Sequence, residues 1–312
     1  MTPPRVLFLS KFPNGGSFIV RGKEVASQRP YWEALSPPPD GSIGPLLEWC
    51  DLVCIIKRIR AIGAYGTIDQ GFPVNHLDEV HKAGKPIVFD VVDWWGQGSG
   101  KNHGAIVHNA QDARELFSIV CDTTVPEACI FANQKMHDDL SLVSPLSTFI
   151  YHHHKPIDVV PLRKEVRTVG YEGQVRYLGE WEQRLRFVCG CLGLEFIVNP
   201  IDFTDMDIGV SVRGGNASNY LSNNYKSNIK ITNIMAAGIP VIAGDSETSA
   251  HEVDNGTIGF FSTEDELQAA IERLLDYDER CRIRKANLET AESFSLSRIA
   301  DRYDGFFQRV VQ

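Results

Sequence analysis

The segment Tyr225–Gly259 combines two lysines with a helix of small residues, a glycine–proline break and an apolar strand. Lys226 and Lys230 are four residues apart, so they share one helix face if this segment is helical. Arg213 follows an earlier apolar run. Open α/β sheets bind ligands beyond the carboxyl ends of their strands, where cations and helix N-termini attract anions. The pattern predicts a site for a phosphate-bearing ligand, with solvated surface cations as the alternative.

Four polar residues near these cations are further candidates for ligand contact. Asn228 and Asn233 could donate hydrogen bonds to phosphate or sugar oxygens, and the helix that contains Asn233 would add its dipole. Helix capping is the alternative for both asparagines. Glu172 lies in a glycine-flanked turn where backbone N–H groups can approach phosphate, although a plain turn also explains the glycines. Glu252 is either a ligand contact or a surface carboxylate.

The first half of the chain supplies carboxylates that could act as a general base. Asp93 follows an apolar run and precedes Trp94 and Trp95, whose rings suit stacking on a sugar or a nucleobase. If the reaction requires a hydroxyl to lose its proton, Asp93 is the candidate for the general base, with Asp90 as its competitor. A capping or salt-bridged role is the alternative for each carboxylate.

Two further motifs in the first half limit the choice of cofactor. Gly15 and Gly16 would let the backbone approach a ligand, or they serve only to reverse the chain. Because a full GxGxxG fingerprint is absent, we expect no dinucleotide cofactor. His152, His153 and His154 are consecutive, and consecutive side chains of an extended chain point in alternating directions, so they cannot all bind one ion. We therefore expect neither a metal nor a cofactor.

Length and composition indicate an ordinary globular protein of two domains. The chain has 312 residues, 43% of them hydrophobic and 23% charged, and single cores usually stop growing below this length. A net charge of −9 disfavours broad nucleic-acid binding, although a local basic surface stays open. The sequence shows neither a signal peptide nor an apolar run long enough to span a membrane. Seven cysteines without regular spacing are typical of a reducing compartment, so we expect a cytoplasmic protein.

Short apolar runs alternate with helical patterns along the whole chain, which predicts an α/β fold with parallel sheets. In the first half we expect helices at Gly22–Leu35 and Asn75–Gly84. The expected strands there are Arg5–Ser10, Asp51–Ile56, Pro86–Asp93, Ser118–Thr123, Ala128–Ala132 and Ser147–Tyr151.

The second half repeats this alternation. The expected strands are Arg167–Tyr171, Glu195–Val198, Asp207–Val212 and Val241–Ala243, and the expected helices are Leu178–Leu192, a helix capped by Thr263 that runs to about Leu275, Glu279–Ala291 and Ser297–Val311. We place a first domain at residues 1–152, a linker at 153–166 and a second domain at 167–295. Residues 296–312 form a last helix that could pack back on the first domain.

Three segments of the second half resemble the donor-binding domain of GT-B glycosyltransferases. Met235–Ala243 is similar to the AMAxGxPVIA segment of that domain, and Val169–Gly173 and Asp207–Val210 followed by Arg213 extend the resemblance. Among these enzymes, retaining members of glycosyltransferase family 4 carry two glutamates eight positions apart. Here Tyr225 and Asn233 stand at those positions, so the paired glutamates are missing.

The resemblance implies two Rossmann-like domains that face a cleft, and a metal-independent glycosyltransferase that uses a nucleotide-diphosphate sugar. The second domain would bind the nucleotide sugar through Glu172, Arg213, Lys226, Asn228, Lys230, Asn233 and Glu252, and the first would add Gly15, Gly16 and the base. The acceptor is left open as a glycan, a small molecule or a modified nucleobase. The alternatives are a nucleotide-sugar epimerase, a catalytically silent sugar-nucleotide-binding protein, and a DNA-modifying glycosyltransferase of the phage type.

Overall fold

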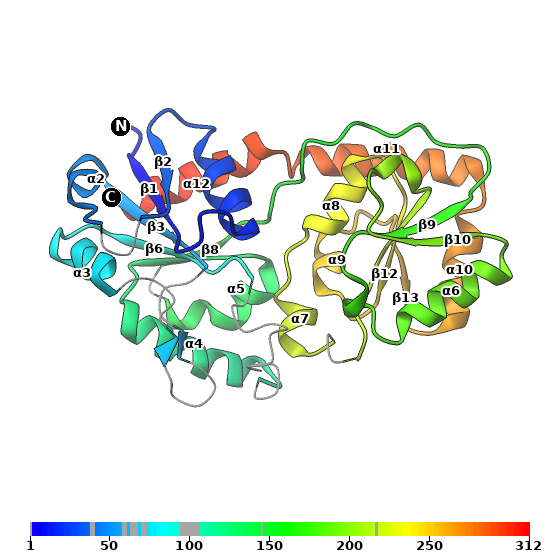
Figure 1. Cartoon of the computed structure of the whole chain (residues 1–312), viewed down its shortest axis with the longest axis horizontal. Helices are drawn as coiled ribbons and strands as arrows, with labels where there is room; N and C mark the ends of the chain where they lie inside the picture. Colours follow the sequence, from blue (N-terminus) through cyan, green and yellow to red (C-terminus); the bar gives the residue numbers. More distant parts are fainter. Residues whose placement is uncertain are drawn as a thin grey trace. The chain divides into compact units, whose positions relative to one another are not determined.

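The computed structural model describes residues 2–37, 41–57, 61–62, 68–69, 74–93, 107–144, 146–215 and 218–312. The chain divides into two compact units (Figure 1). The first unit comprises Met1–His152 and Leu296–Gln312, and the second comprises His153–Ser295. Each unit is built on a parallel sheet, as the alternation of strand and helix predicts.

The first unit is built on a six-stranded parallel sheet of order β2-β1-β3-β6-β7-β8. Most of these strands are buried along their whole length, which is why their sequences are apolar runs rather than alternating patterns. The strands are β1 (Val6–Leu9), β2 (Trp32–Leu35), β3 (Leu52–Ile56), β6 (Ile87–Asp90), β7 (Ala128–Phe131) and β8 (Ser147–Phe149); β4 (Ala61–Ile62) and β5 (Ile68–Asp69) form a separate antiparallel pair.

Short helices connect these strands, and the last helix of the chain completes the unit. They are α1 (Gly16–Phe18), the π-helix η1 (Ile19–Glu24), α2 (Gly44–Trp49), α3 (Val74–Lys82), α4 (Ala110–Thr124), α5 (Gln134–Leu140), the 3₁₀ helix η3 (Ser141–Val143) and α12 (Leu296–Val310). The rings of Tyr303 and Phe307 on α12 lie 6.2 and 5.7 Å from the ring of Phe8 on β1. These aromatic contacts fix the C-terminal helix to the first sheet.

Two expectations for the first unit are wrong. Residues 118–123, expected as a strand, belong to α4, because the side chain of Asn109 caps that helix by accepting from two backbone N–H groups. The helix expected at Gly22–Leu35 ends early, and its last four residues form β2. Pro30 has no N–H to continue a helix, and Trp32 beyond it pairs with Val6 of β1.

The second unit is built on a five-stranded parallel sheet of order β10-β9-β11-β12-β13. Its strands are β9 (Thr168–Tyr171), β10 (Glu195–Val198), β11 (Ile208–Ser211), β12 (Val241–Gly244) and β13 (Gly259–Phe261). Its helices are η4 (Val175–Tyr177), α6 (Trp181–Cys191), η5 (Phe203–Asp205), α7 (Tyr220–Asn224), α8 (Ile229–Ala236), α9 (Thr248–Val253), α10 (Glu264–Arg273) and α11 (Tyr277–Glu292), of which η4 and η5 are 3₁₀ helices.

Local signals in this half mark the elements well, with one exception. The capping box at Thr263 and Glu266 is confirmed, and α10 begins directly after it. The prediction that Lys226 and Lys230 share one helix face is wrong, because α7 ends at Asn224 and α8 begins only at Ile229. Lys226 therefore lies in the turn between two helices.

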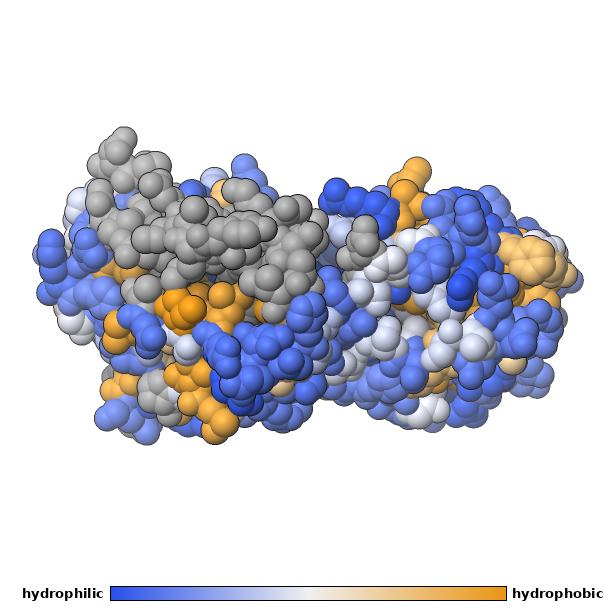
Figure 2. Space-filling model, turned by 90° about the horizontal axis from the view of Figure 1, so that it is seen from below, coloured by the Kyte–Doolittle hydropathy of each residue, from blue (hydrophilic) through white to orange (hydrophobic). Residues whose placement is uncertain are grey.

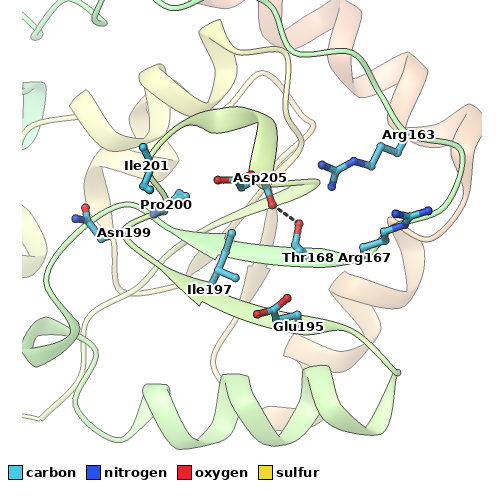
Figure 3. A pocket seen from close by; sticks show the side chains of 9 residues that line it. All are labelled: Arg163, Arg167, Thr168, Glu195, Ile197, Asn199, Pro200, Ile201 and Asp205. Carbon is cyan, nitrogen blue, oxygen red and sulfur yellow. Dashed lines mark hydrogen bonds between the residues drawn. The ribbon is translucent and has the colours of Figure 1, made fainter.

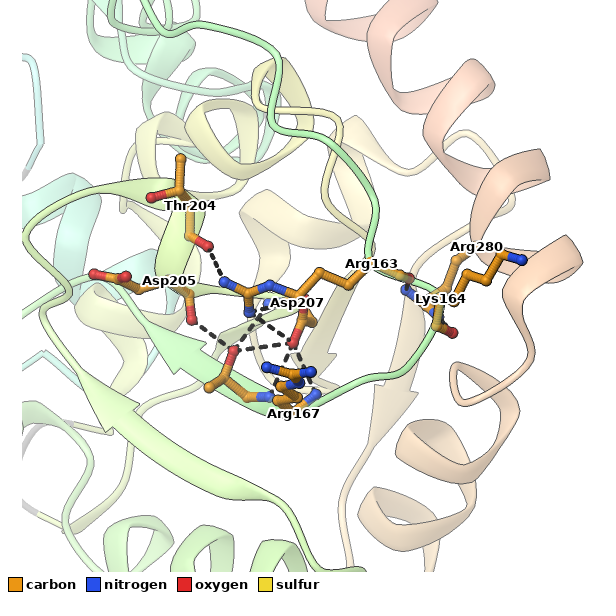
Figure 4. A network of polar contacts seen from close by, with 8 residues as sticks. Arg163, Lys164, Arg167, Thr204, Asp205, Asp207 and Arg280 are labelled. Atoms are coloured by element: carbon orange, nitrogen blue, oxygen red, sulfur yellow. Dashed lines mark hydrogen bonds and ion pairs between the residues drawn. The ribbon is translucent and has the colours of Figure 1, made fainter.

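A polar network ties the segment before β9 to the rest of the second unit (Figure 4). Asp207 accepts hydrogen bonds from the backbone N–H groups of Arg167 and Thr168 at 2.8 and 3.1 Å and pairs with the guanidinium of Arg163 at 3.2 Å. Arg280 of α11 donates to the carbonyl oxygens of Arg163 and Lys164 at 2.9 and 2.8 Å. The segment expected as a linker is thus bound along the second unit at its C-terminal end.

Some large apolar side chains are exposed at the surface of the described residues. On the face drawn in Figure 2, hydrophobic residues lie among hydrophilic ones. The most exposed large hydrophobic residues, Ile201 at 100% and Leu142 at 80%, are far apart in the sequence. Scattered apolar residues of this kind are normal on globular proteins. Within the described ranges, no helix is both long and apolar enough to cross a bilayer.

Candidate functional site

The carboxyl ends of neighbouring strands in the second unit carry a group of charged and polar side chains. After β9 the chain adds β10 on one side and β11 on the other, so the topological switch point of the sheet lies between β9 and β11. Tyr171 is the last residue of β9, Arg213 follows β11, Lys230 lies on α8, and Glu247 follows β12. Open α/β sheets bind ligands at such points. We call these four residues the switch-point cluster.

Lys230 is held over the ring of Tyr171. Its Nζ lies 4.4 Å from the ring centroid and donates to the tyrosine hydroxyl at 3.0 Å. Burial, and next the charge of Arg213, lower the pKa of Lys230 from 10.5 to about 8. Burial also raises the pKa of Tyr171 to about 12, so the phenol stays neutral. An anion that reaches Lys230 would stabilise the charged form that burial disfavours.

Arg213 and Glu247 form a buried ion pair that lacks a hydrogen bond. Arg213 Nε lies 3.5 Å from Glu247 Oε1, and the two side chains are 11% and 4% exposed. Among the described residues, neither atom has a hydrogen-bond partner. Burial raises the pKa of Glu247, although the charges of Arg213, Lys230 and Lys226 oppose this shift. A buried donor without a partner is costly, so Arg213 Nε indicates a place for a ligand that carries an acceptor.

Glu172 and Asn233 pair with each other beside the switch-point cluster. Asn233 Nδ2 donates to the two carboxylate oxygens of Glu172 at 3.2 and 3.1 Å, and Asn233 Oδ1 accepts from the backbone N–H of Lys155 at 2.9 Å. Lys155 Nζ also donates to Glu172, at 2.9 Å. Glu172 lies close enough to Lys230 to raise the pKa of that lysine. Asn233 is only 1% exposed, so in this structure its amide holds Glu172 in place.

The remaining predicted ligand contacts of the second unit lie around the cluster. Lys226 precedes α8, and its charge acts on Glu247. Asn228 is the buried N-cap residue of α8, and its Nδ2 donates to Thr232 Oγ1 at 3.4 Å. Glu252 is half-buried on α9. The charges of Arg213 and Lys226 both act on Lys230, so the structure brings these three predicted cations near one another.

Sequence reasoning missed Tyr171 and Glu247. Tyr171 was read only as a strand residue, although its position at a strand end was a usable signal. Glu247 lies in the polar loop after β12, together with Asp245 and Ser246, and the loop sequence does not tell which side chain turns inward. In the fold Asp245 is exposed and Glu247 is buried.

The first unit has a second polar group at its own switch point, which lies between β1 and β3. Lys57 follows β3, and its Nζ lies 2.5 Å from Asp93 Oδ1 and 3.3 Å from Ser17 Oγ. Lys57 and Val92 have φ values of 70° and 64°, a region that side chains other than glycine rarely adopt. Strained backbone of this kind concentrates at functional sites. Asp93 thus has a cationic partner, Lys57, that sequence reasoning did not identify.

Asp90, the competing base candidate, lies in the interior of the first unit. Its carboxylate is fully buried, accepts from Arg21 Nε at 2.8 Å and also accepts from the hydroxyl of Tyr303. Arg21 Nη1 donates in addition to the carbonyl oxygen of Ile150 at 2.7 Å. This arrangement favours the salt-bridged alternative for Asp90. It also joins the π-helix η1, β6 and α12.

The glycine turn after β1 and two of the three histidines make contacts with the backbone. Gly15 N donates to Phe12 O at 3.2 Å, which closes the turn after β1, and a Cβ added at Gly16 would meet open space. His153 Nδ1 lies 2.9 Å from the carbonyl oxygen of His154, and His154 Nδ1 lies 2.6 Å from the carbonyl oxygen of Lys155. No group of three or more potential metal-binding side chains occurs among the described residues. Trp94 and Trp95, expected as a stacking platform, lie outside the described residues.

A pocket of about 450 Å³ lies elsewhere in the second unit (Figure 3). Figure 3 shows Arg163 and Arg167 at one end of it and Asn199, Pro200 and Ile201 at the other. Thr168 Oγ1 donates to Asp205 O at 2.6 Å inside it. Its strand residues Thr168 and Glu195 begin β9 and β10, so this pocket includes the amino ends of two strands. The switch-point cluster is the candidate site, because it contains buried charged atoms, Arg213 Nε and Glu247 Oε1, that lack hydrogen-bond partners.

Comparison with solved structures identifies the fold. The chain matches the sucrose-phosphate synthase of Thermosynechococcus elongatus with a TM-score of 0.53 and 16% identity, covering 98% of each chain. It matches a trehalose-6-phosphate protein from E. coli, bound with UDP-2-fluoro glucose, with a TM-score of 0.57 and 11% identity over 99% of each chain. The chain has the GT-B fold.

A third match covers a larger protein in part. The pneumococcal O-GlcNAc transferase GtfA, in complex with UDP and GlcNAc, matches with a TM-score of 0.56 and 12% identity, over 86% of this chain and 60% of GtfA. No protein-family model matches the sequence, and neither does any curated protein. At these identities the likeness establishes the GT-B fold, and the chemistry of the site must be argued from its residues.

Proposed function

We propose that the chain is a glycosyltransferase that moves a sugar from a nucleotide-diphosphate sugar to an acceptor hydroxyl. The observation that carries the proposal is the Arg213–Glu247 pair beside Lys230, where buried charges at a switch point lack hydrogen-bond partners. The GT-B fold supports it, as do the neighbours that were solved with UDP or a UDP sugar. Negative charge builds on the diphosphate as the glycosidic bond breaks, and preorganised cations stabilise that charge.

Three residues of the switch-point cluster have defined parts in this proposal, and Lys226 adds to them. Arg213 offers a planar fork of N–H donors that suits bidentate binding of phosphate, and Lys230 offers a compact charge. Tyr171 holds Lys230 in place through its ring and hydroxyl. Because the pKa of Lys230 is about 8, a bound diphosphate would bring it to full charge at neutral pH. Lys226 adds a third positive charge at the edge of the cluster.

The first unit would supply the base for the acceptor. Asp93 is the stronger candidate, because it is 19% exposed and pairs with Lys57, whereas Asp90 is buried and holds Arg21. A transfer that inverts the anomeric centre needs such a base, because the acceptor hydroxyl must lose its proton. We propose that the reaction proceeds without a metal and that Arg213 and Lys230 take the part that a metal would otherwise play at the diphosphate.

Two alternative functions keep the same nucleotide-sugar site. A nucleotide-sugar epimerase would release epimerised sugar nucleotide without an added acceptor. A catalytically silent binding protein would bind the nucleotide without turnover, which agrees with Tyr225 and Asn233 standing where family 4 has its glutamates. A DNA-modifying glycosyltransferase changes only the acceptor, and the net charge of −9 makes duplex binding by the whole surface unfavourable.

The proposal is tested by a thermal-shift screen with UDP, GDP, ADP, CDP and dTDP and their sugars, because a ligand that prefers the folded state raises its melting temperature. We expect one nucleotide series to raise the melting temperature. Lys230→Ala should remove most of that rise, whereas Lys285→Ala, which changes an exposed lysine on α11, should leave it intact. The proposed donor site fails if no nucleotide shifts the protein. Lys230 does not belong to the donor site if nucleotide raises the melting temperature of Lys230→Ala as much as that of the wild type.

A further inference from the structure

Glu247 is the one member of the switch-point cluster whose charge opposes a phosphate ligand. A carboxylate near a diphosphate site repels the ligand, so its presence there requires an explanation. Its side chain is 4% exposed, and it lies 3.5 Å from Arg213, the residue best suited to bind phosphate. The charges of Lys230 and Lys226 also act on it. The positive residues of the cluster thus share one buried anion.

The backbone fixes the position of Glu247. Its N–H donates to Gly244 O at 2.9 Å, and its carbonyl oxygen accepts from Ala250 N at 2.8 Å at the start of α9. A Cβ added at Gly244 would lie 2.8 Å from Val212 Cγ2, so β12 packs closely on the strand that leads to Arg213. The carboxylate can therefore move by rotation of its own side chain, but the loop cannot carry it away without disturbing the sheet.

The contact between Arg213 and Glu247 is held by charge alone. At 3.5 Å, Nε and Oε1 make no hydrogen bond, and among the described residues both atoms are without a hydrogen-bond partner. A charge-assisted hydrogen bond in this setting is considerably stronger than an ion pair without one. A ligand oxygen that accepts from Arg213 would supply the hydrogen bond that Glu247 does not make, and Arg213 can return to Glu247 when the ligand leaves.

We propose that Glu247 is an internal counter-ion that competes with the diphosphate for Arg213 and so speeds the release of the nucleoside diphosphate after transfer. This inference rests on the proposed function. In the free protein Glu247 partly neutralises the cations. A donor with two phosphates displaces it by hydrogen bonding to Arg213 and Lys230, and Glu247 pairs with Arg213 again as the product departs. Glu247 is in this sense a positioning residue, because it acts through Arg213.

The inference is tested by isothermal calorimetry with UDP and with inorganic pyrophosphate, at one pH and one salt concentration. Glu247→Gln keeps the size of the side chain and removes its charge. We expect it to bind both probes at least tenfold more tightly than the wild type, with the gain in a slower dissociation rate measured by stopped flow. Glu289→Gln, which removes an exposed carboxylate on α11, should bind as the wild type does. Equal or weaker binding by Glu247→Gln overturns the inference.

A second variant covers the case in which Glu247→Gln does not fold. Glu247→Asp keeps the charge and withdraws it from Arg213, so it should bind pyrophosphate more tightly than the wild type but less tightly than Glu247→Gln. The two proposals fail in different ways. If the wild type binds UDP and Glu247→Gln gains nothing, only the counter-ion role is lost. If neither protein binds any nucleotide or pyrophosphate, both proposals are overturned.

Discussion

The charge of Lys230 should reduce the stability of the free protein. Its pKa falls from 10.5 to about 8 in the folded state, which corresponds to roughly 3 kcal/mol of disfavoured charge. The double variant Lys230→Met/Tyr171→Phe removes both the buried ammonium and the hydroxyl that would otherwise lose its donor. After allowance of about 1 kcal/mol for the lost hydrogen bond, we expect a net gain in stability of about 2 kcal/mol at pH 7.

The pKa of Lys230 also determines how this difference in stability changes with pH. Below pH 8 Lys230 is protonated in both the folded and the unfolded state, so the folded wild type is destabilised by the full free energy of the buried charge. Between pH 8 and 10.5 the unfolded chain binds more protons than the folded one, so the stability of the wild type rises with pH and the advantage of the variant shrinks. We expect the variant to be more stable than the wild type at pH 7 and to lose most of this difference in stability by pH 10.

Differential scanning calorimetry at pH 7, 8.5 and 10 measures this difference. The relevant transition is the one that the bound nucleotide shifts in the wild type, and we expect it to rise by roughly 5 °C in the variant at pH 7. Lys285→Met, on the exposed surface of α11, serves as the matched control and should change little. A variant that melts lower than the wild type at pH 7, or a gap that does not depend on pH, would refute the reasoning.

Two shorter predictions concern other residues. Asp90→Ala leaves the buried guanidinium of Arg21 without its carboxylate and should lower the free energy of unfolding by about 3–5 kcal/mol in urea denaturation; a loss below about 1 kcal/mol would show that the pair is not structural. Gly173→Ala places a Cβ 2.6 Å from Lys230 Nζ at a φ of 149°, so the lysine must move and the nucleotide-induced thermal shift should fall. An undiminished shift would place Lys230 outside the site.

The fold could be predicted from the sequence to a large extent, because buried parallel strands have a simple signature. Short apolar runs such as Asp51–Ile56 and Glu195–Val198 coincide closely with β3 and β10. The helix Ala110–Thr124 differs from the expected strand at 118–123, because β-branched residues such as Ile119 and Val120 in its second half are typical of strands, whereas the cap at Asn109 starts a helix. Local apolar composition alone does not distinguish a short strand from one turn of a buried helix.

The candidate site was predictable only in part, because charge and position relative to a strand end are visible in sequence but orientation is not. Arg213 and Lys230 were selected by both criteria, and the structure brings them together at the switch point of the second sheet. Lys57 and Asp93 follow two neighbouring strands that are distant in sequence, and the positive φ values at Lys57 and Val92 are visible only in the fold.

Glu247 shows most clearly why a functional site cannot be predicted completely from residue types and their spacing in the sequence. A sequence search for a phosphate site looks for cations and passes over carboxylates, because a carboxylate alone would weaken binding. In the folded chain the buried cations need an anion when no ligand is present, since unpaired charges are costly in an interior of low dielectric constant. A site that must both bind and release a diphosphate therefore benefits from an internal carboxylate. The need for a carboxylate comes from the buried cations themselves and not from contacts with the ligand.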